Sequence, residues 1–197
     1  MRIHRVAFAF AAALALVFAG PVAAQQKVRI GFISTFSGPG GVIGGYMKDS
    51  VELALDHLGR KVGGLEVEMF YGDDQQKPDV GKQVSDEMVK KHQVNFVSGI
   101  IWSNVMLAVA PSVTQAGTFM IGTNAGPHQL AGEGCNEMFF TTSWQNDQTP
   151  EAMGKYMSDA GLNDVYRWRR TTPRARTCSP ASSAPSRAAS PARSTPR

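Results

Sequence analysis

The stretch that decides the fold is "VRIGFISTFSGPGGVIGGYMKDSVELALDHL", residues 28–58. It begins with a largely apolar run from Val28 to Ile33 and continues through a glycine-rich segment at 37–45. It ends in an apolar periodicity that predicts a helix over 47–58. A strand, a glycine-rich turn and a helix N-terminus together form a geometry that binds anions. The stretch therefore predicts the first unit of an α/β fold, and its turn predicts a ligand contact.

Alternating strand and helix patterns continue along the chain after this unit. Strands are predicted at 65–74, 94–101, 118–125 and 138–144, and helices at 78–92, 103–117 and 149–161. Strands separated by helices are typical of a parallel sheet with helices on both faces. The sequence thus predicts a doubly wound α/β fold, whose ligands bind at the carboxyl ends of the strands. The loops expected there are 34–45, 71–77, 98–105 and 122–129, each rich in Gly, Ser, Asn or Thr.

The first 24 residues have the composition of a secretory signal peptide. Basic residues precede the apolar run "VAFAFAAALALVFAG" at 6–20, and the small residues Val22 and Ala24 suit a cut after Ala24. The run is short for a membrane anchor, which needs roughly 20 apolar residues. No cysteine near the cut offers a site for a lipid anchor. We therefore expect a free protein that is exported to the periplasm.

Residues 167–197 differ in composition from the rest of the chain. They hold eight arginines, no acidic residue and no Val, Ile, Leu, Phe or Met. A segment of this composition cannot form a hydrophobic core, so it is predicted to be disordered. Plausible codons for the residues from Trp168 onward can be translated in a shifted reading frame. The resulting sequence has the pattern of a loop, an amphipathic helix and a strand. This favours a frameshifted C-terminus, with a natural disordered tail as the alternative. The body, residues 25–166, holds ten basic and all sixteen acidic residues, which argues against nucleic acid as a partner.

The glycine-rich segment does not match a nucleotide-binding motif. Gly38, Gly40 and Gly44 give G-x-G-x-x-x-G, one residue longer than the dinucleotide fingerprint, and no Lys-Ser/Thr pair follows them. The sequence also lacks G-x-S-x-G, C-x-x-C and clustered His/Cys spacings. The acid pair at 73–74 is typical of a turn, although it also suits a metal ion. We expect no enzyme activity, no cofactor and no bound metal.

Binding of a small anionic or zwitterionic molecule is the function that these loops support. Ser103 and the backbone N–H groups at its helix start suit a ligand carboxylate. The segment from Thr123 to Gly126 offers further N–H groups without bulky side chains. Trp102 and Trp144 suit an apolar part of the ligand, with packing in the core as the alternative. The glycines of 37–45 are interpreted as giving a small solute access to the backbone.

Five segments in this order and spacing resemble the leucine/isoleucine/valine-binding protein family, the periplasmic solute-binding subunits of ABC importers. They are "KVRIGFISTFSGP", "YGDDQQKPDVGKQVSDEMV", "VNFVSGIIWSNVMLAVAP", "FMIGTNAGP" and "FFTTSWQNDQTPEAMGKYM", and the resemblance spans residues 27–166. It implies two α/β lobes that close on a ligand around a hinge. The first crossing between lobes would fall near "TSWQND", so that 25–148 form the N-terminal lobe and 149–166 begin the second.

The resemblance also implies roles for individual residues. It places Ser103 against a ligand carboxylate, the segment Asn124–Gly126 against the carboxylate and ammonium groups, and Ile43 against the side group. The ligand-binding residues predicted in this way and from the loops are Ser37, Ile43, Trp102, Ser103, Asn124, Ala125 and Gly126. Because Gly126 has no hydroxyl and Ile43 is not aromatic, aliphatic amino acids and aromatic carboxylates such as hydroxybenzoates are both candidate ligands.

We therefore expect a monomeric solute-binding subunit of an ABC importer for branched-chain amino acids or related small carboxylates, including aromatic acids. Its partners would be that ligand and a permease in the inner membrane. We expect the chain to be truncated or frameshifted after about Tyr166 and to bind weakly. An exported ligand-sensing receptor domain is the alternative, which a downstream signalling domain would favour. An exported enzyme on the same sheet is a further alternative, and it would require turnover that depends on Ser103.

Overall fold

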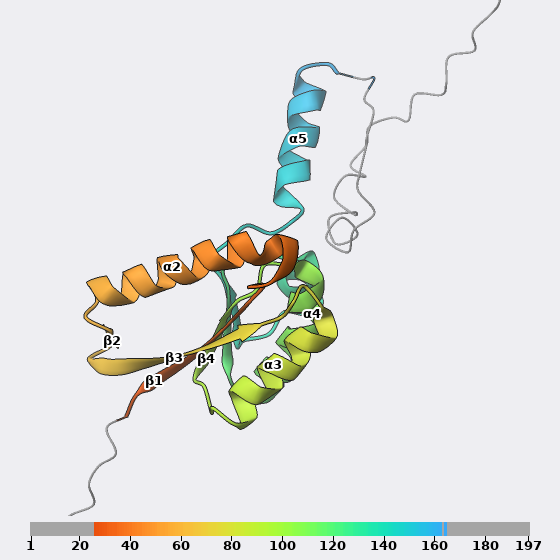
Figure 1. Cartoon of the computed structure of the whole chain (residues 1–197). Coiled ribbons are helices and arrows are strands. Elements are labelled where there is room, and N and C mark those ends of the chain that lie inside the picture. Colours follow the sequence, from red (N-terminus) through yellow and green to blue (C-terminus); the bar gives the residue numbers. More distant parts are fainter. Residues whose placement is uncertain (1–25, 163, 165–197) are drawn as a thin grey trace, which may run out of the picture.

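The computed structural model describes residues 26–162 and residue 164 (Figure 1). The predicted signal peptide 1–24 and tail 167–197 lie outside these residues. Within the described part, six strands form one sheet in the order β2-β3-β1-β4-β5-β6. The strands are β1 (Val28–Ser34), β2 (Lys61–Val62), β3 (Leu65–Asp73), β4 (Phe96–Gly99), β5 (Phe119–Gly122) and β6 (Phe139–Thr141). All neighbours pair in parallel except β2, which runs antiparallel to β3.

Helices lie on both faces of this sheet. The helical segments are η1 (Gly38–Gly40), α2 (Gly41–His57), α3 (Pro78–Lys90), α4 (Ser103–Gln115), η2 (His128–Ala131) and α5 (Gln148–Asp159). Helix α2 lies on one face, and α3 and α4 lie together on the other (Figure 1). Helix α5 projects away from the sheet and buries none of its residues. The predicted doubly wound parallel sheet is confirmed, with one short antiparallel strand added at its edge.

The core fills the space between the sheet and the pair α3 and α4. Apolar residues of α4 recur at helical spacing, and Val105, Met106 and Val109 are fully buried against the strands. Helix α3 approaches α4 closely because Gly81 has no side chain. A Cβ atom at Gly81 would lie 2.6 Å from Cγ1 of Val105. The tight contact of these two helices fixes α4, whose first residues reach the carboxyl ends of the strands.

Helix α2 begins earlier than the sequence predicted, at Gly41 instead of residue 47. The glycines allow the first turns of the helix to lie directly on the end of β1. A Cβ atom at Gly44 would lie 2.0 Å from the carbonyl oxygen of Thr35, and one at Gly41 would lie 2.8 Å from that of Phe36. The low helix propensity of glycine hid this helix start from the sequence pattern. These two glycines therefore allow close packing, a role that the sequence analysis did not predict for them.

The hairpin β2–β3 is an element that the sequence analysis missed. Gly63 and Gly64 form its two-residue loop, with φ angles of 59° and 82°. Two-residue hairpin loops favour residues that adopt positive φ, and Gly-Gly is a common choice. The Gly-Gly pair before the strand beginning at Leu65 was therefore a readable hairpin signal.

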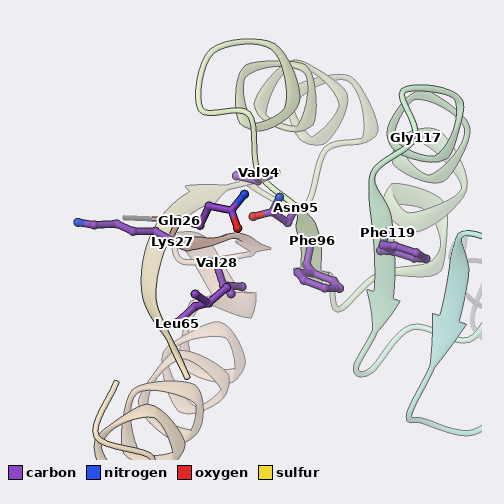
Figure 2. A pocket seen from close by; sticks show the side chains of 9 residues that line it. All are labelled: Gln26, Lys27, Val28, Leu65, Val94, Asn95, Phe96, Gly117 and Phe119. Atoms are coloured by element: carbon purple, nitrogen blue, oxygen red, sulfur yellow. The ribbon is translucent and has the colours of Figure 1, made fainter. Parts of the chain in front are cut away.

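A row of aromatic side chains lies on the sheet face opposite α3 and α4. This aromatic row consists of Phe96, Phe119 and Phe140, with ring centroids 5.8 Å apart for the first pair and 6.1 Å for the second. At the amino ends of the strands, Phe96 and Phe119 line a pocket of about 540 Å³ together with Val28 and Leu65 (Figure 2). This pocket lies at the opposite end of the strands from the predicted ligand loops.

Candidate ligand-binding site

The strand order creates a natural ligand position at the carboxyl ends of β1 and β4. The chain leaves β1 through α2 toward β3, whereas it leaves β4 through α4 toward β5, on the other side of β1. Open α/β sheets bind ligands where the connections diverge in this way. Trp102 bridges the two strand ends, because its Nε1 donates a hydrogen bond of 2.9 Å to Oγ1 of Thr35.

Ser103 is the first residue of α4, and its side chain is buried with 1% of the residue exposed. The preceding residue, Trp102, has extended backbone and supplies no side-chain cap to the helix. The first N–H groups of an α-helix have no partner within the helix. These groups and the Ser103 hydroxyl together offer hydrogen-bond donors to an anion. The predicted placement of Ser103 at a strand end and helix start is confirmed.

The loop containing Asn124, Ala125 and Gly126 is held beside this helix start. On one side, the Ala125 N–H donates to the carbonyl oxygen of Ile100 at 3.2 Å. On the other side, Ser143 Oγ donates to the Asn124 carbonyl oxygen at 3.1 Å. These bonds fasten the loop between the end of β4 and the segment that follows β6. The structure thus brings together four of the seven predicted residues, namely Ser103, Asn124, Ala125 and Gly126.

Gly126 lies where no side chain fits. A Cβ atom there would lie 2.0 Å from the carbonyl oxygen of Trp144, which belongs to the segment after β6. The Gly126 carbonyl oxygen also accepts a hydrogen bond of 2.8 Å from the Asn146 N–H. The absence of a hydroxyl at this position follows from this close backbone approach. Only the backbone of Gly126 is therefore available to a ligand.

The remaining predicted residues lie on the β1 side of the site. Ser37 is exposed, and Ile43 lies in the first turn of α2 with 43% of its surface exposed. Trp102 is partly buried and packs against the hydrophobic core, and a Cβ atom at Gly40 would lie 3.2 Å from its Cζ2. Trp144 is 48% exposed. Packing in the core, the alternative interpretation for the two tryptophans, thus describes Trp102 and not Trp144.

The acid pair after β3 forms the turn that its sequence predicted. Asp73 Oδ1 accepts N–H bonds from Phe36 and Gln75, and Asp74 Oδ1 accepts the N–H of Gln76 at 2.8 Å. The Thr35 hydroxyl donates to the same Asp74 oxygen at 2.5 Å. In the described part of the chain, no three His, Cys, Asp or Glu side chains gather closely enough to hold a metal ion.

The pKa values of the two acids in this turn are shifted in opposite directions. Burial raises the pKa of Asp74 above its ordinary value, and hydrogen bonds from Thr35 and the Gln76 N–H only partly offset this effect. Burial also acts to raise the pKa of Asp73, but hydrogen bonds, first that from Ser37, outweigh burial and lower it. Among the described residues, Oδ2 of Asp74 has no hydrogen-bond partner. Hydrogen bonds therefore stabilise the ionised form of Asp73, whereas burial disfavours the ionised form of Asp74. Both acids contact the segment that follows β1.

Three buried polar residues at this edge were not predicted as part of the site: Thr35, Asp74 and Asn146. Each follows the end of a strand, which is the only signal that the sequence carries. Thr35 and Asp74 form a chain of hydrogen bonds with Trp102, whereas Asn146 donates to Ser103.

None of the helices in residues 26–162 combines the length and apolarity that a bilayer crossing needs.

An open α/β sheet with a buried serine and small-residue loops at its carboxyl edge defines a ligand-binding lobe. Residues 27–179 match the family model described as periplasmic binding protein, and the chain belongs to that family of solute-binding proteins. The predicted family and the N-terminal lobe of its fold are thereby confirmed.

Relatives of known name give the same result. The Leu/Ile/Val-binding protein homolog 6 of Brucella abortus (strain 2308) is 28% identical over 148 residues, which are 75% of this chain and 37% of the relative. A solute-binding protein of an ABC transporter from R. palustris, solved with 4-hydroxybenzoate, is 26% identical with a TM-score of 0.63, over 69% of this chain and 37% of that chain. This chain therefore spans little more than a third of the length of these relatives.

A further structure supports the fold alone. The solute-binding protein of an ABC transporter from Rhodopseudomonas palustris BisB5, in complex with 3,4-dihydroxy benzoic acid, has a TM-score of 0.72 at 22% identity. The match covers 80% of this chain and 43% of that chain.

Proposed function

We propose that this chain provides a ligand-binding lobe of an exported solute-binding subunit of an ABC importer. Its ligand would be a branched-chain amino acid or a related small carboxylate, including aromatic acids. It would work in the periplasm after removal of residues 1–24 and would deliver its ligand to a permease in the inner membrane. The family assignment supports a solute-binding role, and the chemistry of the carboxyl edge supports a carboxylate.

The observation that carries the proposal is the buried Ser103 at the start of α4, next to the loop 124–126. Ser103 is 1% exposed and lies among helix N–H groups that the side chain of the preceding residue, Trp102, does not cap. Such groups favour an anion, because the positive end of the helix dipole adds to their hydrogen bonds. The ligand carboxylate would bind here, and the loop 124–126 would add backbone contacts.

Two ligand classes fit this arrangement. Relatives carry names of Leu/Ile/Val-binding proteins, and a solved relative was crystallised with 4-hydroxybenzoate. Both ligand classes share a carboxylate that Ser103 would bind. They differ in the group that would lie toward Ile43 and Trp144, both of which are exposed at the edge of the site.

Closure of a second lobe over the ligand would complete the site. We propose that the segment near 142–147 crosses between lobes and that residues 149–166, including α5, begin the second one. A ligand that contacts both lobes stabilises the closed state. The contacts that this lobe supplies by itself would give binding in the millimolar range, which corresponds to about 4 kcal/mol.

Binding can be measured by NMR on the ¹⁵N-labelled chain isolated after export. Leucine and 4-hydroxybenzoate would be titrated to about 20 mM, high enough to detect millimolar dissociation constants. We expect amide shifts at residues 103–105 and 124–126, and their loss in Ser103→Ala. The matched control is Ser112→Ala in the same helix, whose hydroxyl donates to the Val109 carbonyl oxygen away from the strand ends. Shifts confined to other regions, or equal effects of both variants, would contradict the proposal.

A further inference from the structure

Asn146 connects both candidate ligand segments to the chain that leaves the sheet. It lies between β6 and α5 and is 5% exposed. Its side-chain Nδ2 donates a hydrogen bond of 2.9 Å to Oγ of Ser103, 43 residues earlier in the sequence. Its backbone N–H donates to the carbonyl oxygen of Gly126 at 2.8 Å. One residue therefore contacts the helix start and the neighbouring loop at once.

The direction of the bond to Ser103 determines what the serine can do. A serine hydroxyl carries one hydrogen and two lone pairs, whereas an amide NH₂ group only donates. Oγ of Ser103 is therefore the acceptor from Asn146, and its own hydrogen stays available to a second partner. Among the described residues, the bond from Asn146 is the hydrogen bond that the Ser103 side chain makes. A buried hydroxyl in this position gains most from a negatively charged acceptor.

We propose that Asn146 is a positioning residue that orients the Ser103 hydroxyl to donate to the ligand carboxylate. The inference rests on the proposed function, since it concerns the same site. Asn146 does not itself contact the ligand in this arrangement. It acts through Ser103 by holding Oγ at one lone pair, so that the O–H bond points elsewhere. The same contact fixes the chain just before α5, which begins two residues later at Gln148.

Two backbone contacts keep Asn146 in place for this role. The Trp144 carbonyl oxygen lies so close to Gly126 that no side chain fits between them, and the Asn146 N–H bonds to the same glycine. On the other side of Asn146, the Asp147 N–H donates a hydrogen bond of 2.7 Å to Oε1 of Gln145 within the same turn. The backbone on both sides of the Asn146 side chain is thus held by hydrogen bonds.

A double-mutant cycle on ligand affinity tests the inference. Dissociation constants for leucine and 4-hydroxybenzoate would be measured by NMR titration for the unaltered chain, Ser103→Ala, Asn146→Leu and the double variant. We expect each single change to weaken binding about threefold to tenfold, as for loss of one hydrogen bond. The double variant should bind no more weakly than Ser103→Ala alone, because Asn146 acts only through Ser103. Independent, multiplying losses would overturn the inference, since a purely structural role predicts them.

A second measurement does not require a change at position 146. The side-chain amide signals of Asn146 should shift when Ser103 is replaced by Ala and again when either ligand is added to the unaltered chain. Unchanged signals in both experiments would overturn the inference even if Asn146→Leu fails to fold. The matched control is Asn136→Leu, whose Oδ1 accepts the Met138 N–H in an exposed loop, and which should leave affinity unchanged.

The outcomes separate the inference from the proposed function. No binding by the unaltered chain would overturn both. Binding that is lost in Ser103→Ala but unaffected by Asn146→Leu would leave the proposed function standing and overturn the role of Asn146.

Discussion

Polar side chains are buried at the carboxyl edge of the sheet, whereas apolar side chains are exposed in the aromatic row, which is the reverse of the usual distribution. At the carboxyl edge, Asp74, Ser103 and Asn146 are 0%, 1% and 5% exposed. On the face opposite α3 and α4, Phe119 and Phe140 are 38% and 54% exposed. Most buried polar side chains in proteins are hydrogen-bonded, and large exposed apolar patches mark contact surfaces.

The difference shows that the two regions are organised by different forces. Directed hydrogen bonds hold the carboxyl edge together and fix the positions of its buried polar side chains. The aromatic row is held by ring contacts between neighbouring strands, stacked for Phe96 and Phe119 and tilted for Phe119 and Phe140, and nothing in residues 26–162 covers it fully. Substitutions should therefore lower the free energy of unfolding more at the buried polar edge than at the exposed aromatic row.

The largest effect is expected at Gly126. Gly126→Ala would place a Cβ atom 2.0 Å from the Trp144 carbonyl oxygen and push apart two backbone segments of the edge. We expect the free energy of unfolding to fall by about 1–3 kcal/mol, as for other overpacked positions, measured by urea denaturation. The matched control is Gly154→Ala in α5, where nothing lies within 4 Å of the added Cβ. Equal stability of both variants would show that the two backbone segments can move apart at little cost in free energy, which would contradict the prediction.

A smaller, pH-dependent effect is expected at Asp74. Burial raises the pKa of Asp74 in the folded state, so the folded chain binds this proton more tightly than the unfolded chain. Its contribution to stability is therefore full at acid pH and is lost as pH rises through the folded pKa. Asp74→Asn removes this loss, so its stability relative to the parent chain should increase from acid to neutral pH.

Urea denaturation at a series of pH values measures this change at Asp74. Any constant cost of the new amide leaves the slope with pH unaltered. Asp79→Asn, an exposed position in the first turn of α3, controls for the removal of a surface carboxylate. A relative stability of Asp74→Asn that falls with rising pH would contradict the buried, raised state of this acid.

The smallest effect on stability is expected in the aromatic row. Phe140→Ser should change the free energy of unfolding by about 0.5 kcal/mol or less, since the residue is 54% exposed and its ring lies 6.1 Å from that of Phe119 at the edge of the row. At high protein concentration, the same change should lower weak self-association of the monomer, because it removes an exposed apolar surface. Sedimentation velocity over a range of concentrations would measure it. A loss of stability as large as that of Gly126→Ala would show that the row belongs to the core.

Much of the fold could be predicted because its signals are local. The apolar runs of β1 and β3 and the helical periodicities of α3 and α4 each repeat over several residues. The start of α2 and the hairpin β2–β3 were missed, because glycines obscure helix propensity at Gly41 and mark a turn at Gly63 that the pattern of apolar residues does not show.

The sequence by itself determined the order of strands and helices, and with it the edge at which a ligand should bind. It also placed Ser103 at a helix start and Asn124, Ala125 and Gly126 in a neighbouring loop. Only the tertiary structure decided that Asn146 donates to Ser103, that Thr35 joins Trp102 to Asp74, and that Gly126 admits no side chain. The physical reason is that periodicity and propensity act between neighbours in sequence, whereas these contacts join backbone and side chains that packing alone brings together.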